Sequence, residues 1–80
     1  MIDPRDLEQR ITQALPGAQV AVEDLTGGGD HYKVQVISDK FEGVSKVQRH
    51  RMVYAPLRDM LGDGALHALA LSTQTPQEAA

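Results

Sequence analysis

Three histidines are the side chains best suited to bind a metal ion in this chain of 80 residues, which contains no cysteine. His31 follows a glycine-rich stretch and His67 lies near the start of a short apolar stretch, so both are expected at strand ends, within reach of a second molecule. His50 falls within a helical apolar pattern, which is typical of an imidazole at the margin of a core. Since zinc ordinarily needs three protein ligands, His31 and His67 predict an incomplete metal site that another molecule must complete.

No motif typical of an enzyme is present. The three glycines at positions 27–29 lack the spacing of a phosphate-binding loop and do not lead from a strand directly into a helix. The serines lack the setting of an activated nucleophile, and the carboxylates form no convincing acid–base pair. Without cysteine there is also no thiolate nucleophile and no disulfide. We therefore expect a protein that is not an enzyme.

Charge is strongly polarised along the chain. The segment from Lys33 to Arg58 holds six basic and two acidic residues, whereas the whole chain has a net charge of −3. Such a segment is typical either of a solvated helix face or of a surface that docks an acidic protein, an anionic tripeptide or nucleic-acid phosphate. Lys46, Arg49 and Arg51 are the candidate contact residues. The net charge and the presence of only three aromatic residues argue against nucleic acid.

The elements that must position these side chains follow from caps and hydrophobic periodicity. Asp3 and Pro4 are typical of a helix start, Ser45 with Gln48 matches a capping box, and Pro56 should interrupt the second helix. The expected elements are a helix from Pro4 to about Leu15, strands over 19–25 and 31–38, a helix over 46–61 and a strand over 66–73. On the second helix, Val47, His50, Tyr54, Leu57 and Leu61 form one apolar stripe.

This order predicts an α+β fold in which helices cover one face of a three-stranded sheet. The loop of five residues at positions 26–30 indicates that the first two strands are antiparallel neighbours. We expect one domain, followed by a flexible tail over residues 77–80 with at most one helical turn starting at Pro76. Because no run of eighteen apolar residues and no secretory start are seen, we expect a soluble, cytoplasmic protein.

Several blocks of sequence resemble the BolA family. They are His31-Tyr32-Lys33-Val34, Phe41-Glu42-Gly43, Val47-Gln48-Arg49-His50-Arg51-Met52-Val53-Tyr54, and His67-Ala68-Leu69-Ala70-Leu71 before Thr75-Pro76. The resemblance covers nearly the whole chain, and its central F-x-G-x-x-x-V-x-R-H-R-x-V-Y string is specific. It implies a fold similar to the class II KH domain, with helices packed on one face of a mixed three-stranded sheet, in a single BolA-like domain over residues 1–76.

The resemblance also implies a partner and a cofactor. BolA-like proteins pair with monothiol glutaredoxins, with or without a bridging 2Fe-2S cluster that glutathione helps to hold, and they are linked to iron–sulfur trafficking and iron regulation. The cluster ligand of the family's H-A-[LF] motif corresponds to His67. The second family ligand lies in the loop before the second strand, where Thr26 to Asp30 contain neither His nor Cys, so His31 is the local candidate. We expect a monomer without metal when isolated and a heterodimer with glutaredoxin.

Two alternative functions remain open. Some BolA-like proteins are described as DNA-binding transcription regulators, and Lys46 could meet a phosphate in that role. However, the stretch from Gly43 to Lys46 lacks the second glycine of the G-x-x-G loop with which KH domains grip a nucleic-acid backbone. The other alternative is an adaptor that binds glutaredoxin without sharing metal.

Overall fold

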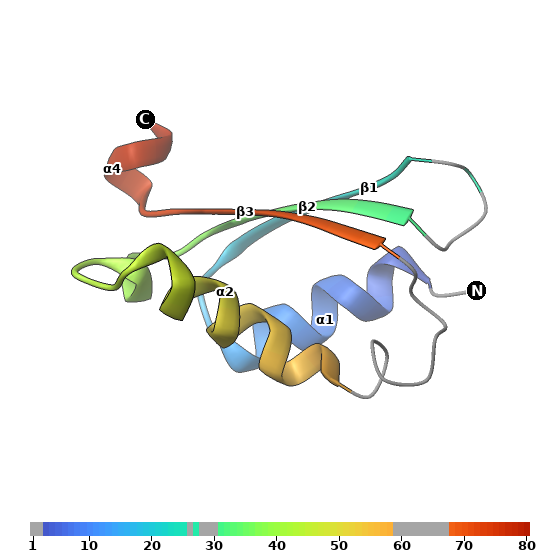
Figure 1. The fold of residues 1–80 in the computed structure, drawn as a ribbon, viewed down its shortest axis with the longest axis horizontal. Coiled ribbons are helices and arrows are strands. Elements are labelled where there is room, and N and C mark those ends of the chain that lie inside the picture. Colours follow the sequence, from blue (N-terminus) through green and yellow to red (C-terminus); the bar gives the residue numbers. More distant parts are fainter. Residues whose placement is uncertain (1–2, 26, 28–30, 59–67) are drawn as a thin grey trace.

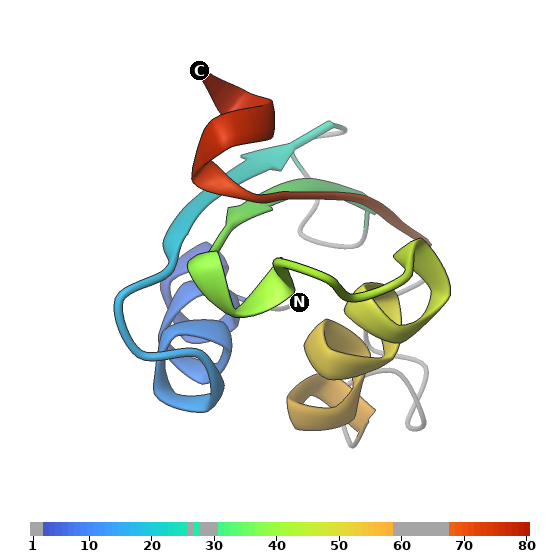
Figure 2. The ribbon, with the colours of Figure 1, turned by 90° about the vertical axis from the view of Figure 1, so that its left-hand side faces the viewer.

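A three-stranded sheet lies on two helices that cover one of its faces (Figures 1 and 2). The computed structural model describes residues 3–25, 27, 31–58 and 68–80. Its elements are α1 (Pro4–Ala14), β1 (Gln19–Asp24), β2 (His31–Ile37), η1 (Asp39–Phe41), α2 (Lys46–Tyr54), η2 (Ala55–Leu57), β3 (Ala68–Gln74) and α4 (Pro76–Ala79). The predicted α+β architecture of two layers is confirmed.

The sheet is mixed, with β2 at its centre. β2 pairs antiparallel with β1 and parallel with β3, so the antiparallel pairing predicted for the first two strands is confirmed. The backbone N–H of Leu25 donates to the carbonyl of His31 at 2.9 Å and extends the hairpin beyond the end of β1. In the parallel pair, His31 lies opposite Ala68.

Local signals set the starts of both longer helices. Asp3 caps α1 by accepting a hydrogen bond of 2.9 Å from the backbone N–H of Arg5. The hydroxyl of Ser45 caps α2 by accepting one of 3.3 Å from the backbone N–H of Gln48. Just before α2, Gly43 has a φ of +72°, a backbone conformation that glycine adopts without the steric cost of a Cβ.

The core lies between β2 and the helices. Because side chains alternate along a strand, Tyr32, Val34 and Val36 face the helices while Lys33 and Gln35 lie on the opposite face. The buried apolar side chains are Leu7, Ile11, Leu15, Tyr32, Val34, Val36, Phe41, Val53 and Leu57. Partly buried apolar residues from β1 and β3 complete the layer.

The apolar stripe predicted for α2 is wrong at its first position. Val47 is 63% exposed, and the buried residues of this segment are Val53 and Leu57. Val53 and Leu57 also have helical spacing, and Leu57 belongs to the predicted stripe as well, so spacing alone does not distinguish the two stripes. Packing against the core selects the stripe that contains Val53.

Pro56 interrupts the second helix as predicted. It lies in η2, which abuts α2 directly, because a proline in a helix removes a backbone donor and crowds the preceding turn. The structure therefore ends α2 at Tyr54, and residues 59–61 of the predicted helix lie outside the described residues.

The C-terminal part differs from the prediction at the end of its strand. β3 runs to Gln74, one residue beyond the predicted strand end, while positions 66 and 67 lie outside the described residues. The possible helical turn starting at Pro76 is present as α4, which Thr75 and Glu78 stabilise through a capping box. None of the helices described is both long and apolar enough to span a membrane.

Candidate functional site

His31 is the first residue of β2. Alternation along the strand places its half-buried side chain on the sheet face away from α1 and α2. Its register partner, Ala68, is the residue that directly follows His67 in the sequence. His67 itself lies outside the described residues. The parallel pairing thus brings His31 next to the first described residue of the H-A-L motif.

His50 occupies a different environment, at the margin of the core as predicted. Its ring meets that of Tyr54 edge-on, with 6.2 Å between the centroids. Its Nε2 atom is buried and has no hydrogen-bond partner among the described residues. A buried Nε2 cannot reach a metal held by a second molecule.

The absence of cysteine limits the kinds of metal ligand that this chain offers. Within residues 3–25, 27, 31–58 and 68–80, no three metal-binding side chains come together. With no cysteine in the sequence, the chain offers imidazole nitrogen as its soft donor apart from thioethers. His31 fits such a role because it stands at the end of a strand that the sheet holds in place.

The three basic residues proposed as a docking surface do not share one helix face. Lys46 and Arg51 are exposed on α2, whereas the Arg49 side chain is only 13% exposed. Arg49 and Arg51 are two residues apart and so point to nearly opposite sides of a helix with about 3.6 residues per turn. Arg49 is therefore engaged within the protein, and Lys46 and Arg51 are the exposed candidates.

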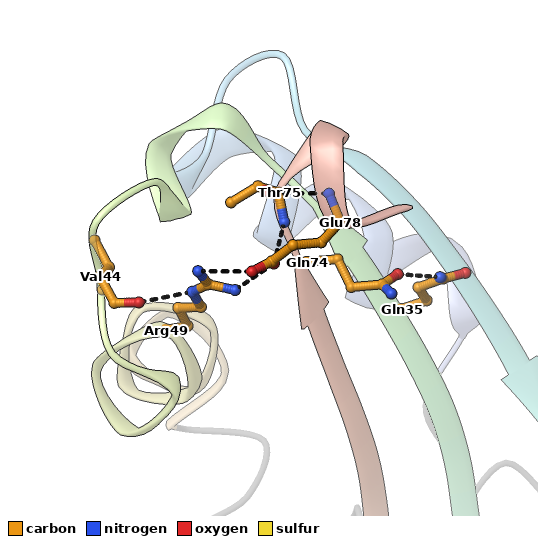
Figure 3. Close-up of polar contacts among 6 residues, drawn as sticks. All are labelled: Gln35, Val44, Arg49, Gln74, Thr75 and Glu78. Carbon is orange, nitrogen blue, oxygen red and sulfur yellow. Dashed lines mark hydrogen bonds and ion pairs between the residues drawn. The ribbon is translucent and has the colours of Figure 1, made fainter. Parts of the chain in front are cut away.

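Arg49 connects α2 to α4 (Figure 3). Its Nε donates to the carbonyl of Val44 at 2.8 Å, and its two terminal nitrogens donate to the Glu78 carboxylate at 2.7 and 3.4 Å. The backbone N–H of Thr75 also donates to Glu78, at 2.8 Å. The hydrogen bonds from Arg49, followed by the one from Thr75, lower the pKa of Glu78 below its ordinary value.

Glu78 is not among the site residues predicted from the sequence, although the sequence contains a local signal for its position in a capping box. Thr75-Pro76-Gln77-Glu78 is a capping-box sequence with proline at the first helical position. Besides the helical turn at Pro76, it would have predicted a Glu78 carboxylate that turns back toward the Thr75 cap. The partnership with Arg49 joins residues 29 positions apart, which no local pattern indicates.

Relatives of this chain are found both in sequence and in structure. Residues 11–78 match the family described as BolA-like protein. Protein BOLA2 of Arabidopsis thaliana is 36% identical over 80 residues, which cover 98% of this chain and 84% of that protein. BolA-like protein 1 of Homo sapiens is 48% identical over 52 residues, which cover 65% of this chain and 37% of that protein. The chain spans less than half the length of several curated relatives that it matches.

Solved structures agree with these matches. BolA1 from Arabidopsis thaliana superposes with a TM-score of 0.86 at 31% identity, with 98% of each chain covered. The BolA domain of SufE1 from the same organism gives a TM-score of 0.82 at 33% identity, covering 94% of this chain and 93% of that chain. From the match over residues 11–78 and from the shared fold, this chain belongs to the BolA-like family.

Proposed function

We propose that this chain is a non-enzymatic partner of a monothiol glutaredoxin, with which it shares a bridging 2Fe-2S cluster. In the complex, the active-site cysteine of the glutaredoxin and the cysteine of glutathione bind one iron, and His67 and His31 bind the other. The complex acts in iron–sulfur cluster trafficking or in iron and redox regulation, and we place it in the cytoplasm.

Family membership supports the partner class, because the resemblance to BolA-like proteins implies glutaredoxin as a partner. The occurrence of a BolA domain within SufE1 of Arabidopsis thaliana favours a role in iron–sulfur assembly for this chain. The absence of cysteine adds a chemical constraint, since no thiolate of this chain can hold iron, and imidazole nitrogen is the ligand that replaces thiolate in known 2Fe-2S centres.

The observation that carries the ligand assignment is the register of the parallel pair. His31 lies opposite Ala68, and His67 directly precedes Ala68 in the sequence. Neighbouring strands in a sheet are about 4.8 Å apart. The register thus brings His31 beside the residue that follows His67, and the 2Fe-2S centres in which two histidines replace two cysteines on one iron are the chemical precedent for two imidazole ligands.

The test is a spectroscopic titration of the reconstituted cluster. A monothiol glutaredoxin carrying its cluster with glutathione is mixed with this chain, and visible absorption and circular dichroism are recorded. We expect a new spectrum with the native chain, its loss with His67→Ala and its weakening with His31→Ala. His50→Gln is the matched control, because it removes an imidazole whose Nε2 atom is buried.

Two results would count against the proposal. An unchanged spectrum on adding the native chain would favour the cluster-free adaptor or the DNA-binding alternative. A native spectrum from the His67→Ala variant would show that iron is held without this imidazole, even if the two proteins associate.

A further inference from the structure

The Arg49 guanidinium is held by groups other than the carboxylate that it binds. Its Nε donates to the Val44 carbonyl at 2.8 Å, and its Cζ lies 5.8 Å from the centre of the Phe41 ring. Phe41 is fully buried in the core. These two contacts fix the position of the side chain from the interior and leave the terminal nitrogens to bind an anion.

Glu78, which occupies those nitrogens, lies on an exposed element. α4 has four residues, none of them buried, and the Glu78 side chain is 49% exposed. Glu78 otherwise exchanges hydrogen bonds with Thr75, and the backbone N–H of Ala79 donates to the Thr75 carbonyl. So short a helix has little stability of its own. The attachment of α4 to α2 therefore depends on the ion pair with Arg49 (Figure 3).

We propose that Arg49 is a carboxylate receptor for an acidic segment of a protein partner, and that Glu78 occupies this receptor as an internal competitor. The receptor is built from the core side, whereas its present ligand is exposed and locally tethered, so exchange of one carboxylate for another leaves the core intact. A planar guanidinium binds a carboxylate through two parallel hydrogen bonds, which gives the receptor its preference for carboxylates. The inference rests on these contacts alone and does not require the cluster.

The surroundings favour an acidic peptide as the partner. Lys46 is exposed and lies three residues before Arg49, so the two residues are neighbours on the same side of α2. A peptide segment with two nearby carboxylates would place one on Arg49 and the other on Lys46. The group that Arg49 binds in this structure is itself a carboxylate, at 2.7 and 3.4 Å, which favours an acidic peptide over the phosphates of a nucleic acid.

The experiment compares variants of equal charge. The ¹⁵N-labelled full chain is titrated with acetylated, amidated tetraglutamate at neutral pH and low ionic strength, and the Arg49 Nε–H signal is followed by NMR. Glu78→Gln removes the competitor but keeps an acceptor for the Thr75 N–H. Glu8→Gln, at an exposed position of α1, is the control for the change in net charge. An exposed ion pair such as that of Glu78 is weak, so its removal should give only a modest gain. We expect the Glu78→Gln variant to bind tetraglutamate about two- to fivefold more tightly than the Glu8→Gln variant does.

A second variant tests the receptor itself. In the Glu78→Gln background, Arg49→Lys keeps the positive charge but loses the two-pronged geometry. Binding is followed in this variant by the backbone N–H signals of α2, and we expect the gain in affinity to disappear. Equal affinity of Glu78→Gln and Glu8→Gln, or a gain that survives Arg49→Lys, would overturn the proposal. A gain for a DNA oligonucleotide but not for tetraglutamate would also overturn it, because the receptor would then select phosphate.

Discussion

Replacing Arg49 by alanine should destabilise the fold far more than replacing Arg51, although both are arginines on the same helix. Arg49 is 13% exposed and binds the Val44 carbonyl, while its guanidinium lies over the Phe41 ring. Arg51 is exposed to solvent. Arginine and alanine have similar helix propensities, so a comparison of Arg49→Ala with Arg51→Ala isolates the contribution of tertiary contacts to stability.

The expected loss follows from the two inward contacts of Arg49. A hydrogen bond from a charged donor contributes about 1.5–3 kcal/mol, and a cation–π contact adds about 0.5–1 kcal/mol. The ion pair with Glu78 adds little to this loss, because the Glu78 side chain is 49% exposed and solvent weakens the attraction. The free energy of unfolding should fall by about 2–4 kcal/mol for Arg49→Ala and by less than about 0.5 kcal/mol for Arg51→Ala.

Urea unfolding followed by circular dichroism measures both changes. In a domain of this size, a loss of 1 kcal/mol lowers the melting temperature by about 4–8 °C, so thermal unfolding gives an independent reading. Similar destabilisation by both substitutions, or a loss below about 0.5 kcal/mol for Arg49→Ala, would refute the structural role assigned to Arg49.

Three further predictions concern acid stability, the turn before α2 and the shared cluster. A hydrogen bond from the Arg5 backbone lowers the pKa of Asp3, and hydrogen bonds from Arg49 lower the pKa of Glu78. The two ionised carboxylates therefore stabilise the folded state above the unfolded-state pKa of about 4. This stabilisation is lost as the pH falls through their folded-state pKa values. Urea unfolding between pH 7 and pH 3 should show a smaller loss for the Asp3→Asn/Glu78→Gln double variant than for the native chain; parallel curves would contradict this. Gly43→Ala should cost about 1–2 kcal/mol, because φ is +72° although no atom would contact the added Cβ, and an unchanged unfolding midpoint would be inconsistent with that backbone conformation. Because imidazole must be neutral to bind iron, the cluster shared with glutaredoxin should be lost at higher pH than the all-thiolate cluster of the glutaredoxin homodimer, and equal loss of visible absorption from both between neutral pH and pH 5 would argue against histidine ligation.

The features that could be predicted from the sequence are those that depend on near neighbours in the chain. The Asp3 cap of α1, the alternation of Tyr32 and Val34 in β2 and the interruption at Pro56 are all set within a few residues. The antiparallel hairpin follows from the short loop between β1 and β2. In each of these cases, local backbone preference and tertiary packing favour the same conformation.

The features that were not predicted depend on contacts between distant residues. Helical spacing allowed Val47 to face the core, and packing buried Val53 instead. Arg49 belonged to a basic segment by composition, but its guanidinium turns toward Glu78, 29 residues away. The register of β2 and β3, which brings His31 to Ala68, likewise joins strands that are remote in the sequence. The parts of the candidate site that matter most for function are therefore set by tertiary structure.

The central claim is that imidazole nitrogen from this chain binds iron in a complex with a second protein. It is tested most directly by electron–nuclear double resonance on the reduced cluster, with ¹⁵N-histidine incorporated into this chain alone. We predict strong ¹⁵N hyperfine couplings from two imidazoles, one of which disappears in the His31→Ala variant, whose cluster is weakened but still forms. A reduced cluster without ¹⁵N coupling, formed in a stable complex of the two proteins, would contradict the claim.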